Sequence, residues 1–188
     1  SSINRSLSAL KSFFKYLARE YDLTDPTYEV SANRLPRRLP KALTVFEVTS
    51  LIESAERLGN TKSLRDRAIL ELLYGTGARV SEVIALNIGD IGKSLLEGVE
   101  ITTLKLQGKG GKERLVPLGT FGKSALDDYL IRLRPSLLSK SKSPKNVSAI
   151  FLNSRGGRLT RQSAWQLVID AAREVDLEGK VSPHVFRH

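Results

Sequence analysis

Two runs with strand character flank a glycine-rich segment, and together they limit the fold more than any other feature of the sequence. Residues 99–106 are rich in β-branched side chains, and residues 113–118 alternate in character. The segment 107–112 between them holds three glycines, which indicates a β-hairpin turn or a closely spaced loop. We therefore expect Lys109 at its tip. Its flexible ammonium could reach a phosphate or an oxygen leaving from it, although turns of glycine and lysine often serve solubility alone.

The rest of the chain carries apolar residues mainly at helical spacing. A capping box at Thr44–Glu47 predicts one helix start, and Thr160 predicts another. Before residue 182, six helices are expected, over residues 2–20, 46–58, 64–74, 78–86, 122–133 and 160–175. The Ser-, Lys- and Pro-rich stretch 134–148 is predicted to be a mobile surface loop, and residues 149–152 a short strand. The fold class predicted is mainly α (α+β), helical with a small β-hairpin or three-stranded sheet.

Composition limits the classes of function. The 188 residues carry a formal net charge of +10, which favours polyanions, and nucleic acid first among them, as partners. Cysteine is absent, which excludes disulfides, thiolate metal sites and cysteine nucleophiles. With His184 and His188 the only histidines, a histidine-based zinc site is not expected either. Since no apolar run approaches the roughly 20 residues that span a bilayer, we expect a cytosolic protein without a membrane partner.

The sequence divides into three parts. Residues 1–24 comprise one amphipathic helix and the short segment that follows it. Because the apolar surface of this helix needs partners, we expect it to be the final helix of a preceding helical domain. Residues 25–41 contain three prolines and are typical of a linker, and residues 42–188 form the main domain. The linker carries a basic cluster that could follow a phosphate backbone or simply be solvated: Arg34, Arg37, Arg38 and Lys41. Because the chain contains no Met, we also expect an N-terminal part to have been trimmed.

The last seven residues, 182–188, combine a helix start with an acid–base group and a cation. Ser182 is a good N-cap and Pro183 suits the first helical position. His184 and Arg187 would then share one face near free backbone N–H groups, where Arg187 could hold a phosphate while His184 transfers a proton. Taken alone, such a pair is more often a solvated face or a local cap than a catalytic pair.

Arg79 falls in the first turn of the predicted helix 78–86, where the helix dipole disfavours a cation. Two explanations are open. Arg79 could point at an anion, or Glu82 three residues later could simply pair with it, and the salt bridge is favoured on these residues alone. Four further basic residues are candidates for DNA contact: Lys112, Arg155, Arg158 and Arg161.

Three segments, Gly75–Glu82, Gly108–Leu118 and Ser182–His188, together resemble the tyrosine recombinase (phage integrase) family, in the order that this family uses. The likeness is greatest to the Xer-type site-specific recombinases of bacterial and archaeal chromosomes, and it covers nearly the whole chain. It implies that residues 1–24 are the last helix of a helical core-binding domain that binds DNA. It also implies that residues 42–188 are most of the catalytic domain.

The resemblance assigns a role to each motif residue. Arg79 and Arg187 would match the two arginines that clamp the non-bridging oxygens of the scissile phosphate. Lys109 would match the hairpin lysine that protonates the departing 5′ oxygen, and His184 the histidine that assists proton transfer. Glu82 would support Arg79 rather than take part in the chemistry. His188 would have a minor role.

The resemblance also implies a nucleophilic tyrosine beyond the Ser182–His188 motif, and this chain ends before it. The five tyrosines of the chain all precede the motif, and none matches the nucleophile's setting: Tyr16, Tyr21, Tyr28, Tyr74 and Tyr129. Residues 1–188 alone are therefore expected to bind DNA without forming the covalent intermediate. The complete protein would exchange strands through a 3′-phosphotyrosyl link and need no metal or nucleotide cofactor.

The implied setting is a recombinase tetramer, homomeric or heteromeric, on double-stranded DNA near the bacterial or archaeal nucleoid. Resolution of chromosome dimers, with a septal DNA translocase as a further partner, is the first expectation. Two alternatives stay open: the integrase of a mobile element, with the same chemistry, and a non-catalytic DNA-binding protein that uses only its basic surface.

Overall fold

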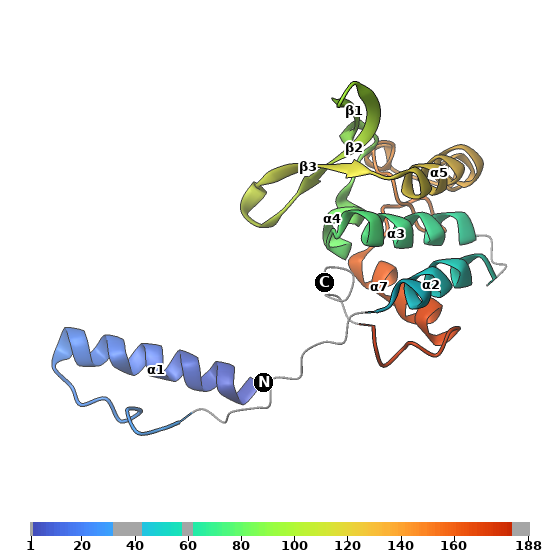
Figure 1. The fold of residues 1–188 in the computed structure, drawn as a ribbon. Helices are drawn as coiled ribbons and strands as arrows, with labels where there is room; N and C mark the ends of the chain where they lie inside the picture. Colours follow the sequence, from blue (N-terminus) through green and yellow to red (C-terminus); the bar gives the residue numbers. More distant parts are fainter. Residues whose placement is uncertain (1, 32–42, 58–61, 182–188) are drawn as a thin grey trace. The chain divides into compact units, whose positions relative to one another are not determined.

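The computed structural model divides the chain into two compact units, Ser1–Leu39 and Pro40–His188 (Figure 1). It describes residues 2–31, 43–57 and 62–181. Helix α1 belongs to the first unit, and every other helix and strand of the described residues belongs to the second.

The first unit is built on helix α1 (Ser2–Tyr21), close to the predicted range. A turn follows, in which the Asp25 carboxylate accepts hydrogen bonds from the backbone N–H and the hydroxyl of Thr27. Large side chains along α1 remain about half exposed, including Phe13 at 54% and Tyr16 at 50%. That α1 closes a preceding helical domain stays a prediction.

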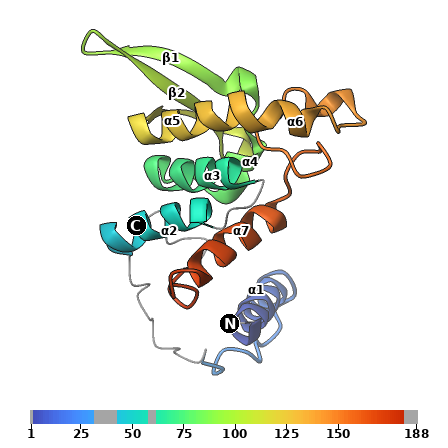
Figure 2. The same ribbon diagram turned by 90° about the vertical axis from the view of Figure 1, so that its right-hand side faces the viewer.

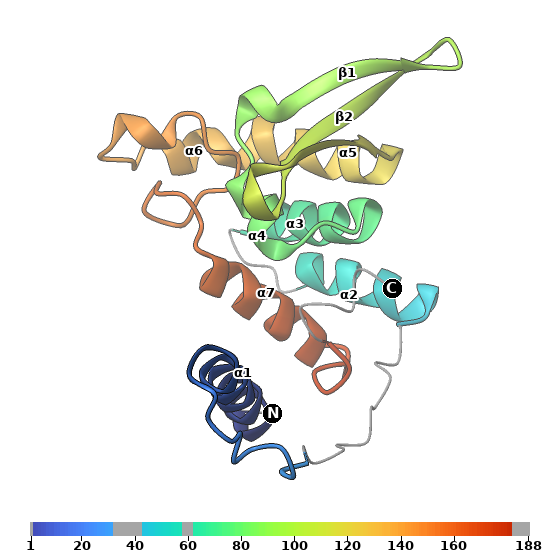
Figure 3. The ribbon, with the colours of Figure 1, turned by 90° about the vertical axis from the view of Figure 1, so that its left-hand side faces the viewer.

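The second unit is mainly helical. Its helices are α2 (Val45–Arg57), α3 (Ser63–Thr76), α4 (Val80–Ala85), α5 (Thr120–Asp128), α6 (Arg134–Leu138) and α7 (Arg161–Arg173). With increasing distance from the sheet, α5, α3 and α2 follow one another, and α7 lies beside α2 (Figures 2 and 3). Two predicted caps are confirmed: the Glu47 N–H donates to Thr44 Oγ1 at 3.2 Å, and the Ser163 N–H donates to Thr160 Oγ1 at 3.1 Å.

One antiparallel sheet with the strand order β1-β2-β3 accompanies these helices. The strands are β1 (Ile91–Leu96), β2 (Val99–Gln107) and β3 (Glu113–Leu118). The predicted hairpin is therefore β2–β3, while β1 was not located from the sequence. A two-residue turn joins β1 to β2, and its residues Glu97 and Gly98 both have positive φ, which suits the twist of a tight hairpin. The predicted fold class, helical with a small three-stranded sheet, is confirmed.

The core of this unit is completed by residues 149–152, all of which are fully buried. They form only isolated bridges, Asn87 with Ala149 and Leu152 with Arg158, so the predicted short strand is not a regular one. The ring of Tyr129 stacks on Phe151 with centroids 5.5 Å apart. The Tyr129 hydroxyl donates to the Ile150 carbonyl at 3.0 Å and accepts from the Leu152 N–H at 3.1 Å, so the buried segment is tied to the helix that contains Tyr129.

The prediction of a mobile loop over residues 134–148 was wrong for its first part. The helix that begins with α5 continues through a π-helical turn, η3 (Tyr129–Leu133), into α6, and Leu137 is buried. The Arg134 guanidinium donates to the carbonyl oxygens of Val147, Ala149 and Ile150. These bonds fix the segment against the core, although its composition is typical of a loop.

Replacing Tyr129 by Phe removes one hydroxyl and leaves two buried backbone groups without that partner. We expect the free energy of unfolding to fall by about 1–3 kcal/mol, measured by urea denaturation. Tyr28→Phe is the matched control, because Tyr28 is 87% exposed. Its effect should stay within about 0.5 kcal/mol. Equal stability of the two variants would contradict the structural role of the Tyr129 hydroxyl.

Candidate functional site

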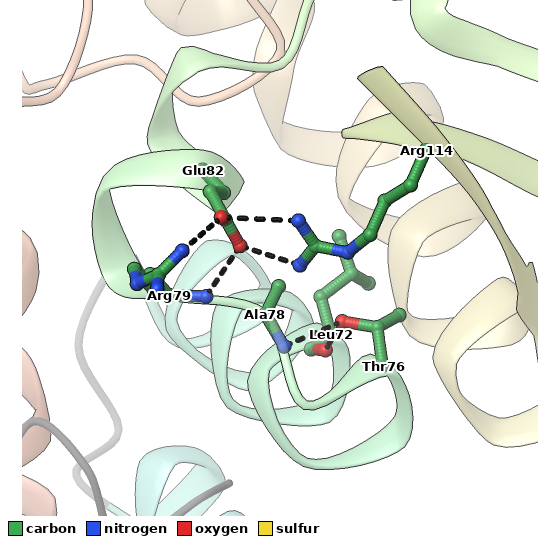
Figure 4. A network of polar contacts seen from close by, with 6 residues as sticks. All are labelled: Leu72, Thr76, Ala78, Arg79, Glu82 and Arg114. Atoms are coloured by element: carbon green, nitrogen blue, oxygen red, sulfur yellow. Dashed lines mark hydrogen bonds and ion pairs between the residues drawn. The ribbon is translucent and has the colours of Figure 1, made fainter. Parts of the chain in front are cut away.

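The site begins at the sharp turn between α3 and α4. Helix α3 ends at Thr76, and Gly77 follows in the left-handed conformation with φ 58°. The Thr76 hydroxyl donates to the Leu72 carbonyl at 2.6 Å and accepts from the Ala78 N–H at 3.2 Å (Figure 4). These bonds, together with the buried Ala78, fix the backbone that leads into Arg79.

Arg79 is the N-cap of α4, with extended backbone (φ −74°, ψ 149°), and the helix itself begins at Val80. The predicted helix start at Ala78 was therefore two residues early. The sequence suggested that Arg79 lies inside the first turn of the helix, but it lies one residue before that turn. Its side chain is 45% exposed, so the guanidinium is held at one side and open to solvent at another.

Glu82 holds Arg79 from inside the domain. Its side chain is only 3% exposed. One carboxylate oxygen accepts from the Arg79 backbone N–H and the other from Arg79 Nη1, both at 2.9 Å (Figure 4). The backbone contact is one half of a capping box, in which the third helical residue reaches back to the N-cap. The predicted Arg79–Glu82 salt bridge is present.

Arg114 on β3 completes this arrangement, and it was not predicted from the sequence. Its guanidinium forks across Glu82, with Nη1 3.1 Å from Oε1 and Nη2 2.7 Å from Oε2 (Figure 4). A signal was present in the sequence. Alternation along β3 puts Arg114 on the same face as Val116 and the buried Leu118, where a charged residue requires a partner.

The hydrogen bonds from Arg114, together with those from the backbone and side chain of Arg79, lower the pKa of Glu82 from the usual 4.5 to about 2, although burial acts in the opposite direction. The pKa of the Arg114 guanidinium is raised by the same contact. Glu82 is therefore an ionised carboxylate in a nearly dry setting. Its charge is compensated by two cations from different elements, which makes it an anchor rather than a proton donor.

Lys109 lies where the sequence predicted, in the short turn η2 (Lys109–Gly111) between β2 and β3. Gly110 and Gly111 have φ values of 76° and 75°, which a residue with a side chain rarely adopts. The Gly108 N–H donates to the Lys112 carbonyl at 2.7 Å and closes the base of the turn. The turn is thus a defined structure rather than an open loop.

The other predicted catalytic residues, His184 and Arg187, lie outside the described residues, as does His188. The same holds for the basic linker residues Arg34, Arg37, Arg38 and Lys41. The proposed gathering of two arginines, a lysine and a histidine around one phosphate therefore remains a prediction. Within the part of the chain that the structure describes, Arg79, Glu82 and the hairpin are brought together.

The three arginines near the start of α7 are not equivalent. Arg155 and Arg161 are exposed. Arg158 instead donates to the carbonyl oxygens of Ile84, Ala85 and Leu86 and to the side chain of Asn87. These carbonyls lie at the end of α4, so the guanidinium completes the helix from across the domain. This geometry favours a structural role for Arg158 over the predicted DNA contact, while Arg155, Arg161 and the exposed Lys112 stay candidates.

Tyr129 is fully buried and uses its hydroxyl within the core, so it is not available as a nucleophile. No group of three or more His, Cys, Asp or Glu side chains that could hold a metal ion occurs among residues 2–31, 43–57 and 62–181. In the same ranges, no helix is long and apolar enough to cross a membrane.

Comparison with known proteins gives a family match and close relatives. Residues 41–188 match the phage integrase family. Over its whole length the chain is 44% identical to tyrosine recombinase XerD of Mycobacterium leprae and covers 58% of that protein. It is 39% identical to tyrosine recombinase XerC of Roseiflexus sp., again over its whole length and 58% of the relative. The chain thus spans less than two thirds of the length of these curated relatives.

Among solved structures, the chain resembles the XerH site-specific recombinase bound to a palindromic difH substrate in a post-cleavage complex. The TM-score is 0.70 at 25% sequence identity, over 96% of this chain and 52% of the XerH chain.

Because the pKa of Glu82 is lowered in the folded protein, the free energy of unfolding is expected to depend on pH. Its ionised form stabilises the fold above the usual pKa of 4.5, and this contribution is lost as the pH falls toward about 2. We expect the unmodified protein to be more stable than Glu82→Gln near neutral pH, and the difference in free energy of unfolding to shrink from about pH 5 downward. Chemical denaturation at several pH values measures it. A difference that stays constant over this range would contradict the assignment.

Proposed function

This chain belongs to the phage integrase family of tyrosine recombinases, and we propose that its protein cleaves and rejoins double-stranded DNA at specific sites. The observation that carries the proposal is the fixed Arg79 guanidinium, anchored on buried Glu82 and open to solvent on its other side. An arginine held in this way is ready to receive a phosphate oxygen without reorganisation. The anchoring of this one arginine supports a catalytic role for Arg79 beyond binding.

In the proposed reaction a tyrosine oxygen attacks the scissile phosphorus while the bond from phosphorus to the 5′ oxygen breaks. Arg79 and Arg187 hold the non-bridging oxygens as their negative charge increases. Lys109 gives a proton to the departing 5′ oxygen, and His184 assists proton transfer. The attacking tyrosine is proposed to lie beyond His188. A 5′-hydroxyl then attacks the phosphotyrosyl link and reverses the step, so the bond energy is conserved.

Glu82 is assigned the supporting role in this scheme. It fixes the direction of Arg79 and, because it is ionised and buried, leaves no proton to exchange with the substrate. The charge on the phosphate is neutralised by two guanidinium groups and one ammonium, which is the function that a divalent metal serves in other phosphate-cleaving enzymes. No cofactor is part of the proposal.

The proposed assembly is a tetramer of recombinase subunits, homomeric or heteromeric, on paired duplexes. The DNA-bound XerH complex supports DNA as the partner. Resolution of chromosome dimers in the bacterial or archaeal cytosol is the preferred role, since relatives at 44% and 39% identity are named XerD and XerC. The integrase of a mobile element is the second candidate, because the family match itself is to phage integrases.

The proposal is tested by cleavage of a nicked suicide substrate, which traps the covalent protein–DNA adduct. In the full-length gene product, Arg79→Ala should lower the rate of adduct formation about a hundredfold or more, because one fixed donor to the transition state is lost. Arg132→Ala is the control, since Arg132 lies in an exposed ion pair with Asp128. The non-catalytic DNA-binding alternative survives only if the unmodified full-length protein forms no adduct.

Binding to phosphates should also make affinity depend strongly on salt. For about six neutralised phosphates, the dissociation constant should rise roughly a thousandfold between about 50 and 200 mM salt. Fluorescence anisotropy with a labelled duplex measures this. Arg155→Ala and Arg161→Ala should each reduce the slope of log K against log salt by about 0.9. Arg158→Ala is expected to lower thermal stability and leave the slope unchanged. A flat salt response would exclude binding through phosphates.

A further inference from the structure

The Glu82 carboxylate joins two parts of the candidate site that are far apart in the sequence. Arg79, at the start of α4, bonds it from one side, and Arg114, on β3, bonds it from the other (Figure 4). The start of α4 and the hairpin are therefore linked through a single, nearly buried anion. Loss of either arginine would leave Glu82 with less compensation.

Arg114 approaches Glu82 from the face of the sheet that packs on the core. It is paired across the strands with Leu106, which is fully buried, and its guanidinium meets both oxygens of the carboxylate. Such a forked contact fixes orientation as well as distance. A lysine at this position could supply the charge but not the fork.

The Glu82–Arg114 pair also lies against the base of the turn that carries Lys109. A Cβ atom added to Gly108 would be 3.6 Å from Glu82 Oε1 and 3.6 Å from Arg114 Nη1. Gly108 directly precedes Lys109, and its N–H closes the turn by bonding the Lys112 carbonyl. Hence the pair lies beside Gly108, with room for little more than the missing side chain between them, at the point from which the lysine turn departs.

We propose that Arg114 is a positioning residue for protonation of the leaving oxygen: through Glu82 it holds the Lys109 turn in a fixed place relative to Arg79. The inference rests on the proposed recombinase function. It adds a structural connection between Arg79, which is proposed to hold the phosphate, and the turn of Lys109, the proposed proton donor. Two other roles are distinguishable from this one. Arg114 could merely stabilise the domain, or its 41% exposed side chain could contact a phosphate directly.

The test compares two suicide substrates that differ in one atom, with oxygen or sulfur in the 5′ bridging position. When the tyrosine attacks the sulfur substrate, the phosphorus–sulfur bond breaks and a thiolate leaves. A thiolate is a weak base and departs without a proton, so this substrate does not need the lysine. Loss of a correctly placed proton donor should therefore slow only the oxygen substrate.

In the full-length protein, Arg114→Ala should slow cleavage of the oxygen substrate about tenfold to a hundredfold. Cleavage of the sulfur substrate should retain most of its rate. Lys109→Ala should show the same pattern, whereas Arg79→Ala should be slow with both substrates. Arg132→Ala again serves as the matched arginine control and should match the unmodified protein on both.

An equal loss on both substrates, or no loss on either, would overturn the positioning role of Arg114. A weaker affinity for uncleaved DNA in Arg114→Ala, without the difference between substrates, would assign it to phosphate contact instead. If Arg114→Ala is unfolded at the assay temperature, Arg114→Lys carries the same comparison, because it keeps the charge and loses the fork. Failure of the unmodified protein to cleave either substrate would instead refute the proposed function itself.

Discussion

The arrangement of the site depends on one buried carboxylate. An ionised Glu82 in a nearly dry position is unfavourable unless its oxygens are bonded. Here the backbone and side chain of Arg79 and the fork of Arg114 together occupy both oxygens. The need to satisfy this charge forces the start of α4 and strand β3 to meet. A requirement of electrostatics thereby becomes a constraint on where the two parts of the site lie.

The positive charge of the chain is not all directed outward. Arg65 donates to the Leu152 carbonyl, Arg134 to carbonyls in 147–150 and Arg158 to those at the end of α4. Each guanidinium donates to backbone oxygens that lie either in an irregular segment or at the end of a helix, and its several N–H donors suit that task. The net charge therefore overstates the number of basic residues that are available to a polyanion. The structure separates the arginines that bind backbone carbonyls from the basic side chains that are exposed to solvent.

Much of the fold follows from local patterns, while the missing parts depend on distant contacts. The glycines of 107–112 and the alternation around them were enough to predict the β2–β3 hairpin. Strand β1 was missed, since residues 91–96 become a strand only by pairing with β2. The helix over 134–138 was missed because its composition is typical of a loop, and because the hydrogen bonds from Arg134 that hold it reach carbonyls more than ten residues away. Likewise, Arg79 and Glu82 are three residues apart and could be paired from the sequence, whereas Arg114 reaches Glu82 from 32 residues away.

Helix α4 has only six residues, and each of its ends is bonded to another part of the domain. Glu82 and Arg79 define its beginning, and Arg158 holds the carbonyls at its end. One residue inserted between these ends would rotate everything after it by about 100° and turn either the carboxylate or the carbonyls away from their partners. Evolution of this stretch can therefore exchange its exposed side chains, such as Ser81, more readily than it can accept insertions or deletions, so its length should vary less among relatives than its exposed composition.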